Sequence, residues 1–167
     1  MSQILRLRGG NALSAFRSSR LLGSLRNSVS RITAVHAEYW HFIELERALS
    51  DVEARRLDRI LAYGPADAAA AASGELMLVV PRFGTISPWS SKATDIARHC
   101  ALEAVRRVER GVAYRLVTGN SQGLSAGERA ALAPLVHDRM TETVLASLDE
   151  AGRLFAHFEP KPLATVD

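Results

Sequence analysis

Two short apolar segments are predicted to form strands that each begin one half of the chain. Residues 4–8 alternate between apolar side chains and arginine, as in a strand with one exposed face. Residues 76–80 are apolar throughout, which is typical of a strand covered on both faces. Apolar residues at helical spacing then predict helices over about 13–25 and about 91–102. Each half therefore begins with a strand and a helix.

A long extended segment follows in each half, over residues 31–45 and 105–118. Both segments exceed the usual length of a single strand. We therefore expect each to contain the turn of a hairpin or a bulge, at His36-Ala37 in the first half and at Gly111 in the second. A capped helix closes each half, because Ser50 and Ser125 are each followed three residues later by glutamate, the pattern of a capping box.

These features repeat at an offset of 75 residues. Leu49–Leu57 matches Leu124–Leu132, Tyr39 matches Tyr114, and Arg31 matches Arg106. Shared capping chemistry would explain the helix starts alone, whereas the tyrosines lie outside the helices and favour a duplication. The predicted fold class is α+β, with two tandem β-α-β-β-α halves in a ferredoxin-like arrangement.

The expected domain boundaries follow from this repeat. The first half spans residues 1–64, a linker spans 65–74, the second half spans 75–158, and residues 159–167 begin a further linker.

Composition narrows the functional classes. The chain has 167 residues, of which 47% are hydrophobic, and a net charge of +3. We expect no membrane span, because no apolar run is long enough, and no nucleic-acid partner, because the arginines are spread along the chain. The single cysteine, Cys100, excludes a disulfide and is expected to be a buried apolar residue of a cytoplasmic protein.

Residues 1–31 contain six arginines and no acidic residue, which is also the composition of an organelle-targeting peptide. We favour the first strand and helix of the fold, because the repeat requires them.

The segment Pro81-Arg-Phe-Gly-Thr-Ile-Ser-Pro-Trp-Ser-Ser-Lys92 is the most informative in the chain. It follows the apolar strand, and the next helix is expected to begin at Ser90 or Ser91. Loops that carry tryptophan and arginine are favoured contact sites. The predicted interface residues are Arg82, Thr85, Ser87, Trp89, Ser90, Ser91 and Lys92.

Two other interpretations of this loop remain open. Arg82, Lys92 and the helix start could hold a phosphate or nucleotide, as in a small regulatory domain. Alternatively, the loop is a rigid connection with Trp89 packed on the domain.

No catalytic, cofactor-binding or metal-binding residues are predicted. A Ser-x-x-Lys dyad ending at Lys92 would need serine where Trp89 stands, and Gly84-Thr85 lacks the lysine of a phosphate-binding loop. The histidines are not spaced for a metal, and His36 and His41 should point to opposite faces of a strand.

Several segments, in order along the chain, resemble the N-terminal region of the large proteobacterial phosphoribosylformylglycinamidine synthase. The most specific is the stretch Pro81–Ala97. The others are Ala12–Arg17, Ala37–Tyr39, Tyr63–Pro65, Glu109–Tyr114, His137–Met140 and Leu154–His157.

This resemblance implies a non-catalytic N-terminal domain similar to a fused pair of PurS-type subunits. The family converts formylglycinamide ribonucleotide, ATP and glutamine to the amidine in purine synthesis. The implied partners are an ATP- and magnesium-dependent synthetase domain and a cysteine-dependent glutaminase domain of the same polypeptide, and Cys100 is not matched to the glutaminase nucleophile. The isolated fragment is expected to be inactive, and it could form a homodimer.

Overall fold

The structure is a computed structural model that describes residues 3–63, 73–120 and 122–156. The tail at 159–167 and residues 65–72 of the predicted linker lie outside the described residues. The strands are β1 (Gln3–Asn11), β2 (Ile32–Leu45), β3 (Glu75–Pro81), β4 (Val105–Thr118) and β5 (Glu142–Leu145). The helices are α1 (Ala15–Ser28), α2 (Asp51–Leu61), α3 (Pro88–His99), α4 (Ala126–Val136) and the 3₁₀ helix η1 (Asp149–Phe155).

Both halves contribute to one antiparallel sheet with the strand order β1-β2-β4-β3-β5. This arrangement confirms the α+β class with tandem ferredoxin-like halves. The two long segments each form one 14-residue strand, and they pair with each other. Trp40 pairs with Gly111 in the middle of this ladder, and the register is continuous through His36-Ala37, so neither the turn nor the bulge expected at these positions is formed. Mutual pairing through the middle of the sheet is what allows strands of this length.

Gly111 provides room for a neighbouring strand. A Cβ atom at this position would lie 2.8 Å from the Val79 carbonyl oxygen and 2.9 Å from Cγ1 of Val80. The glycine that looked like a turn residue in the sequence therefore allows β3 to approach β4 closely.

A half-turn about the centre of the β2–β4 ladder exchanges the two halves. Glu38 pairs with Ala113, and these residues are 75 positions apart, the offset of the sequence repeat. Helices α2 and α4 differ by the same offset at both ends. Both predicted capping boxes, from Ser50 and Ser125, are confirmed. The repeat in the sequence is thus a pseudo-twofold axis in the structure.

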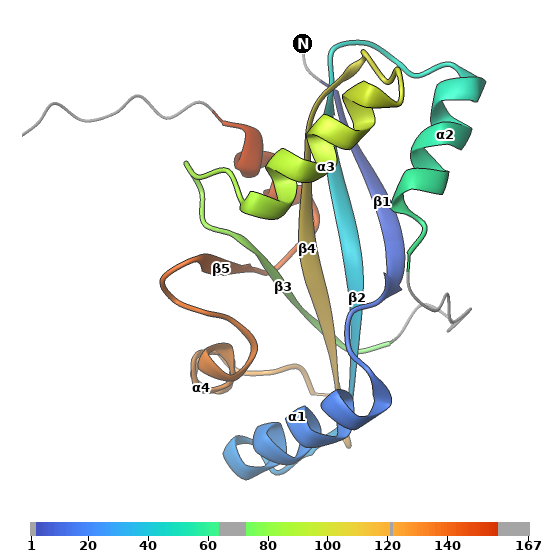
Figure 1. Cartoon of the computed structure of the whole chain (residues 1–167). Helices are drawn as coiled ribbons and strands as arrows, with labels where there is room; N and C mark the ends of the chain where they lie inside the picture. The colour runs from blue at the N-terminus through green and yellow to red at the C-terminus, as the bar shows by residue number, and fades with distance from the viewer. Residues whose placement is uncertain (1–2, 64–72, 121, 157–167) are drawn as a thin grey trace, which may run out of the picture.

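All four α-helices cover the same face of the sheet. Val35 and Ile43 point to one face of β2, since they are an even number of residues apart in a continuous ladder. Val35 packs with Leu25 of α1 and against α4, whereas Ile43 packs with Leu57 of α2 and against α3. The helices therefore form two pairs, with α1 and α4 at one end of the sheet and α2 and α3 at the other (Figure 1).

Part of the opposite face is covered by η1. Phe42 and Leu78 are fully buried there against Leu154 of η1. Strand β5, which the sequence patterns did not predict, extends the sheet beyond β3. No helix in the described parts of the chain has the length and apolar character to span a membrane.

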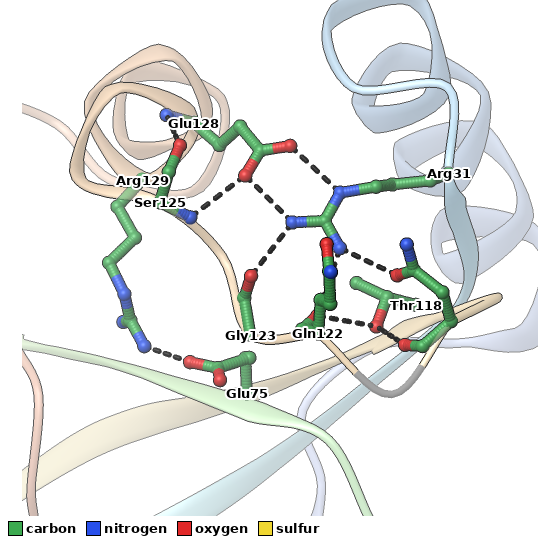
Figure 2. A network of polar contacts seen from close by, with 9 residues as sticks. Arg31, Glu75, Thr118, Gln122, Gly123, Ser125, Glu128 and Arg129 are labelled. Carbon is green, nitrogen blue, oxygen red and sulfur yellow. Dashed lines mark hydrogen bonds and ion pairs between the residues drawn. The ribbon is translucent and has the colours of Figure 1, made fainter.

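The two halves are joined by polar contacts at the end of the sheet near α4 (Figure 2). Arg31 donates to both carboxylate oxygens of Glu128, at 2.8 and 2.7 Å, and to the backbone carbonyls of Gln122 and Gly123. This hydrogen bonding from Arg31 lowers the pKa of Glu128 to about 2. In the first half the capping Glu53 is instead bound by Arg47 from its own loop. The capping boxes are alike, but only the second takes its arginine from the other half.

The acid-free segment 1–31 supplies β1, α1 and their connections to the fold. Strand β1 pairs with β2 along its length, and Leu25 of α1 is fully buried. The interpretation of this segment as part of the fold is confirmed.

Candidate functional site

The loop between β3 and α3 carries most of the residues predicted to form an interface. Its helix starts earlier than expected, because the Ser87 hydroxyl accepts a hydrogen bond from the backbone N–H of Ser90 at 3.0 Å. The predicted start at Ser90 or Ser91 is therefore wrong. Serine is preferred at the N-cap and proline at the first helical position. The Ser87-Pro88 pair therefore sets the start of α3 at Pro88.

A tight turn shapes the first part of this loop. The Arg82 carbonyl accepts hydrogen bonds from the backbone N–H and the hydroxyl of Thr85, at 3.3 and 2.7 Å. Gly84 has a φ of +80°, the left-handed value that the third residue of a type II turn requires. The Phe83 ring lies 4.4 Å from the guanidinium of Arg153 in η1. The loop therefore has a defined shape on both sides of its glycine.

A buried ion pair fixes the loop from inside. Glu109 of β4 is completely buried, and its carboxylate accepts hydrogen bonds from the Ser87 hydroxyl at 3.1 Å and from Nε of Arg107 at 3.0 Å. Arg107 also donates to the carbonyls of Thr85 and Leu154, which ties the loop to η1.

The Glu109 carboxylate also lies where the anion site was predicted. It lies at the start of α3, where Arg82, Lys92 and free backbone N–H groups were expected to hold a phosphate or nucleotide. The Ser87 hydroxyl at this position already donates to Glu109 and accepts from the Ser90 N–H, so the helix start is occupied by internal contacts. The geometry of the helix start therefore favours an internal structural role.

A cluster of aromatic side chains and one arginine lies beside the loop. Arg110 of β4 lies over the rings of Tyr39 and Trp89, at 4.3 and 4.5 Å from their centroids. It also donates a hydrogen bond to the Tyr63 hydroxyl at 3.1 Å, and that hydroxyl is 2.7 Å from Nε2 of His41. We call these five residues the Arg110 cluster. Trp89 is half-buried within it, which agrees with the alternative interpretation that Trp89 packs on the domain.

A cavity of about 270 Å³ opens next to the Arg110 cluster, between the start of α3 and strands of the sheet. Ser87 and Trp89 are the predicted site residues that line it. The rest of its lining is Tyr39, Val79, Pro81, Arg110, Gly111, Val112 and Glu142. With a cation and aromatic faces on its wall, this cavity is suited to recognition.

The remaining predicted interface residues do not share one environment. Arg82, Thr85, Ser91 and Lys92 are exposed. Ser90 is fully buried, so its prediction as a surface contact is wrong.

The residues considered for metal binding are also separate. Cys100, predicted to be buried, is half-buried at the end of α3, where its carbonyl accepts a hydrogen bond from Arg56. His36 is exposed, whereas His41 is buried on the helix-covered face, so their predicted opposite orientation is confirmed. The described residues include no group of three His, Cys, Asp or Glu side chains that could hold a metal ion.

His41 is the buried titratable group of the cluster, and it predicts a pH-dependent stability. Burial, together with the charge of Arg110, lowers its pKa from 6.5 to about 4. The unfolded chain therefore binds a proton near pH 6.5 that the folded chain binds only near pH 4. Folding stability should fall as the pH falls through this interval, by about 3 kcal/mol in total. Chemical denaturation between pH 7 and pH 4 measures this loss.

The matched control lies on the same strand. The His41→Gln variant should lose this part of the pH dependence, whereas His36→Gln, at an exposed position, should retain it. Equal pH profiles for wild type and His41→Gln would contradict the assignment.

Four separate segments of the sequence that carry the family resemblance meet in the Arg110 cluster. Tyr39, Tyr63, Trp89 and Arg110 each come from a different one of these segments. The patterns did not single out Arg110 or Glu109, because neither has a local signal such as a cap or a turn. Their shared membership in the Glu109–Tyr114 segment was the available indication.

The part of the chain that matches a known family includes this site. A family model for the N-terminal part of formylglycinamide ribonucleotide amidotransferase matches residues 38–155. The match extends from β2 to the end of η1 and includes the loop, the Arg110 cluster and the buried ion pair. It spans well over half of the chain. The chain therefore belongs to the formylglycinamide ribonucleotide amidotransferase N-terminal family.

Proposed function

We propose that this chain is a non-catalytic scaffold and docking domain of the amidotransferase. In the complete polypeptide, ATP, magnesium and glutamine would be bound by the synthetase and glutaminase domains, which convert formylglycinamide ribonucleotide to the amidine. The domain described here would support those domains through its surface. Its single cysteine fits a reducing, cytoplasmic setting.

The observation that carries this proposal is a rigid loop with an exposed apolar residue. Ile86 is 62% exposed, although the Arg82–Thr85 turn, the Arg107–Glu109 pair and the Ser87 cap fix the loop around it. A loop that is already ordered loses little conformational entropy when it binds, so it is well suited to a permanent contact.

A second exposed apolar residue lies in the connection that runs beside this loop. Met140 is 77% exposed, and the neighbouring Thr141 carbonyl accepts a hydrogen bond from the backbone N–H of Arg82. Ile86, Met140, Arg82 and Arg139 together define what we call the loop surface. It combines apolar side chains with arginines, as interface residues often do.

The internal contacts of the polar groups favour docking over catalysis. Ser87 is bonded to Glu109, Glu109 to Arg107, and His41 to Tyr63. These groups stabilise the domain, and the surface that they support is the part available to a partner.

The proposal predicts that Ile86→Asp lowers the amidine-forming rate of the complete amidotransferase. The apolar contact of a buried isoleucine is worth about 1.5–3 kcal/mol. Its replacement by a charge should weaken docking roughly tenfold or more. The measurement is the initial rate with glutamine as nitrogen donor, together with hydrogen exchange of residues 82–87 in the complete enzyme.

The matched control is Val52→Asp, which introduces the same charge at an exposed apolar position on α2. It should leave the rate unchanged. A normal rate in Ile86→Asp would count against the loop surface. Glutamine hydrolysis by the 167 residues alone would contradict a non-catalytic domain.

A further inference from the structure

An apolar groove opens between α1 and α4, at the end of the sheet away from α2 and α3. It has a volume of about 510 Å³, within the range of ligand and peptide sites. Its apolar lining consists of Leu13, Phe16, Leu21, Tyr114 and Leu135. Phe16 is 75% exposed, although phenylalanine side chains are usually buried.

Positive charge borders this groove. Arg17 and Arg20 line it and are exposed, and neither forms an ion pair with a described residue. The lining includes no aspartate or glutamate, and α1 has no acidic residue at all. A binding partner that complements this groove should therefore carry apolar side chains flanked by carboxylates.

The opposite end of the sheet shows how the equivalent position is partly filled. Phe16 is the second residue of α1, as Trp89 is the second residue of α3, and Tyr114 repeats Tyr39. Trp89 packs onto Arg110, which also lies over Tyr39, and so partly fills this end from within the domain. Phe16 and Tyr114 line an open groove. The two ends therefore differ in the space left open, about 510 Å³ beside Phe16 and about 270 Å³ beside Trp89, where Arg110 stacks on the rings.

We infer that the α1–α4 groove docks an amphipathic helix with acidic flanks from another domain of the amidotransferase. A groove between two helices accepts a row of side chains at helical spacing, i, i+3, i+4 and i+7. Arg17 and Arg20 would pair with the flanking carboxylates, while Phe16 and Leu135 would contact the apolar row. The inference rests on the proposed docking function, and it adds a second surface and the chemistry of its occupant.

Photo-crosslinking in the complete amidotransferase tests this inference. A benzophenone amino acid replaces Phe16, and peptide mass spectrometry identifies the crosslinked segment. The expected product joins residue 16 to a segment of the same polypeptide, outside this domain, with apolar residues at helical spacing and aspartate or glutamate beside them. A crosslink to a second copy, a crosslink to a segment without acidic residues, or no crosslink would overturn the inference.

Crosslinkers at two other positions separate this inference from the proposed function. Replacement of Ile86 probes the loop surface, and replacement of Val52 probes the exposed face of α2. Crosslinking from residue 86 to another domain, without crosslinking from residue 16, would reject the groove and retain the docking function. If neither residue 16 nor residue 86 crosslinked to another domain, both the groove and the proposed docking function would be rejected.

The acidic flanks inferred for the docked helix are tested separately. Arg17→Glu combined with Arg20→Glu should reduce the residue 16 crosslink at least tenfold, because the flanking carboxylates would then be repelled. Arg55→Glu with Arg59→Glu makes the same change at exposed positions on α2 and should leave the yield unchanged. An unchanged yield in the groove variant would contradict the acidic flanks.

Discussion

Deletion of residues 1–31 is expected to abolish cooperative folding of the domain. The deletion removes β1, which pairs with β2 from Gln3 to Asn11, and α1, whose Leu25 is fully buried. Burial of a side chain such as Leu25 contributes about 1.5–3 kcal/mol, and β2 would lose a row of backbone partners as well. The total stability of a small domain is only about 5–15 kcal/mol, so losing these contacts together removes a large part of it. Differential scanning calorimetry should show no cooperative transition in the truncated chain.

A surface change in the same segment provides the control. Arg17→Ala replaces an exposed side chain of α1 and should leave the transition temperature close to that of the wild type. If the truncated chain unfolded like the intact one, the first strand and helix would be dispensable. The interpretation of residues 1–31 as a targeting peptide would then be the better one.

Arg107→Met is expected to lower the free energy of unfolding by about 3–5 kcal/mol. This substitution leaves the carboxylate of Glu109, which has no exposed surface, without its charged partner. It also removes the hydrogen bonds that Arg107 donates to Thr85 and Leu154. Urea denaturation at neutral pH measures the loss.

The neighbouring arginine is the matched control. Arg106 is 3.6 Å from Glu46 in an ion pair whose two side chains are both more than half exposed. Such pairs are worth about 0–1 kcal/mol, so Arg106→Met should be nearly neutral. Combining Arg107→Met with Glu109→Gln should recover part of the lost stability, since no charge then remains buried. Equal losses in the free energy of unfolding for Arg106→Met and Arg107→Met would contradict the argument that burial makes the Arg107–Glu109 pair the more important one.

Features with a local cause were predictable from the sequence. The capping boxes at Ser50 and Ser125 place α2 and α4 correctly, because a cap depends on residues three positions apart. The start of α3 was placed too late even though the Ser87-Pro88 signal is local, because several serines follow it. The lengths of β2 and β4 were harder to predict from the sequence, since each strand is stabilised by pairing with the other.

The Arg110 cluster depends on features that no local pattern records. Arg110 lies opposite His41 in the β2–β4 ladder and reaches Tyr39 on the same face. A shift of one residue in this register would move Arg110 to the other face of the sheet. Trp89 then joins the cluster only because α3 packs across this face. The site is therefore a product of tertiary structure.

The pseudo-twofold axis also affects the orientation in which a partner can bind this domain. An ideally duplicated domain would present two equivalent surfaces, and a partner could bind it in either of two poses related by a half-turn. This domain has a longer connection before α3, residues 82–87, than before α1, residues 12–14. Counted from the helix starts, Ile86 corresponds to Leu13, but Ile86 is 62% exposed whereas Leu13 is half-buried. If the domain docks as proposed, the unequal connections would select one pose, and the duplicated sheet would hold its neighbours in a single arrangement.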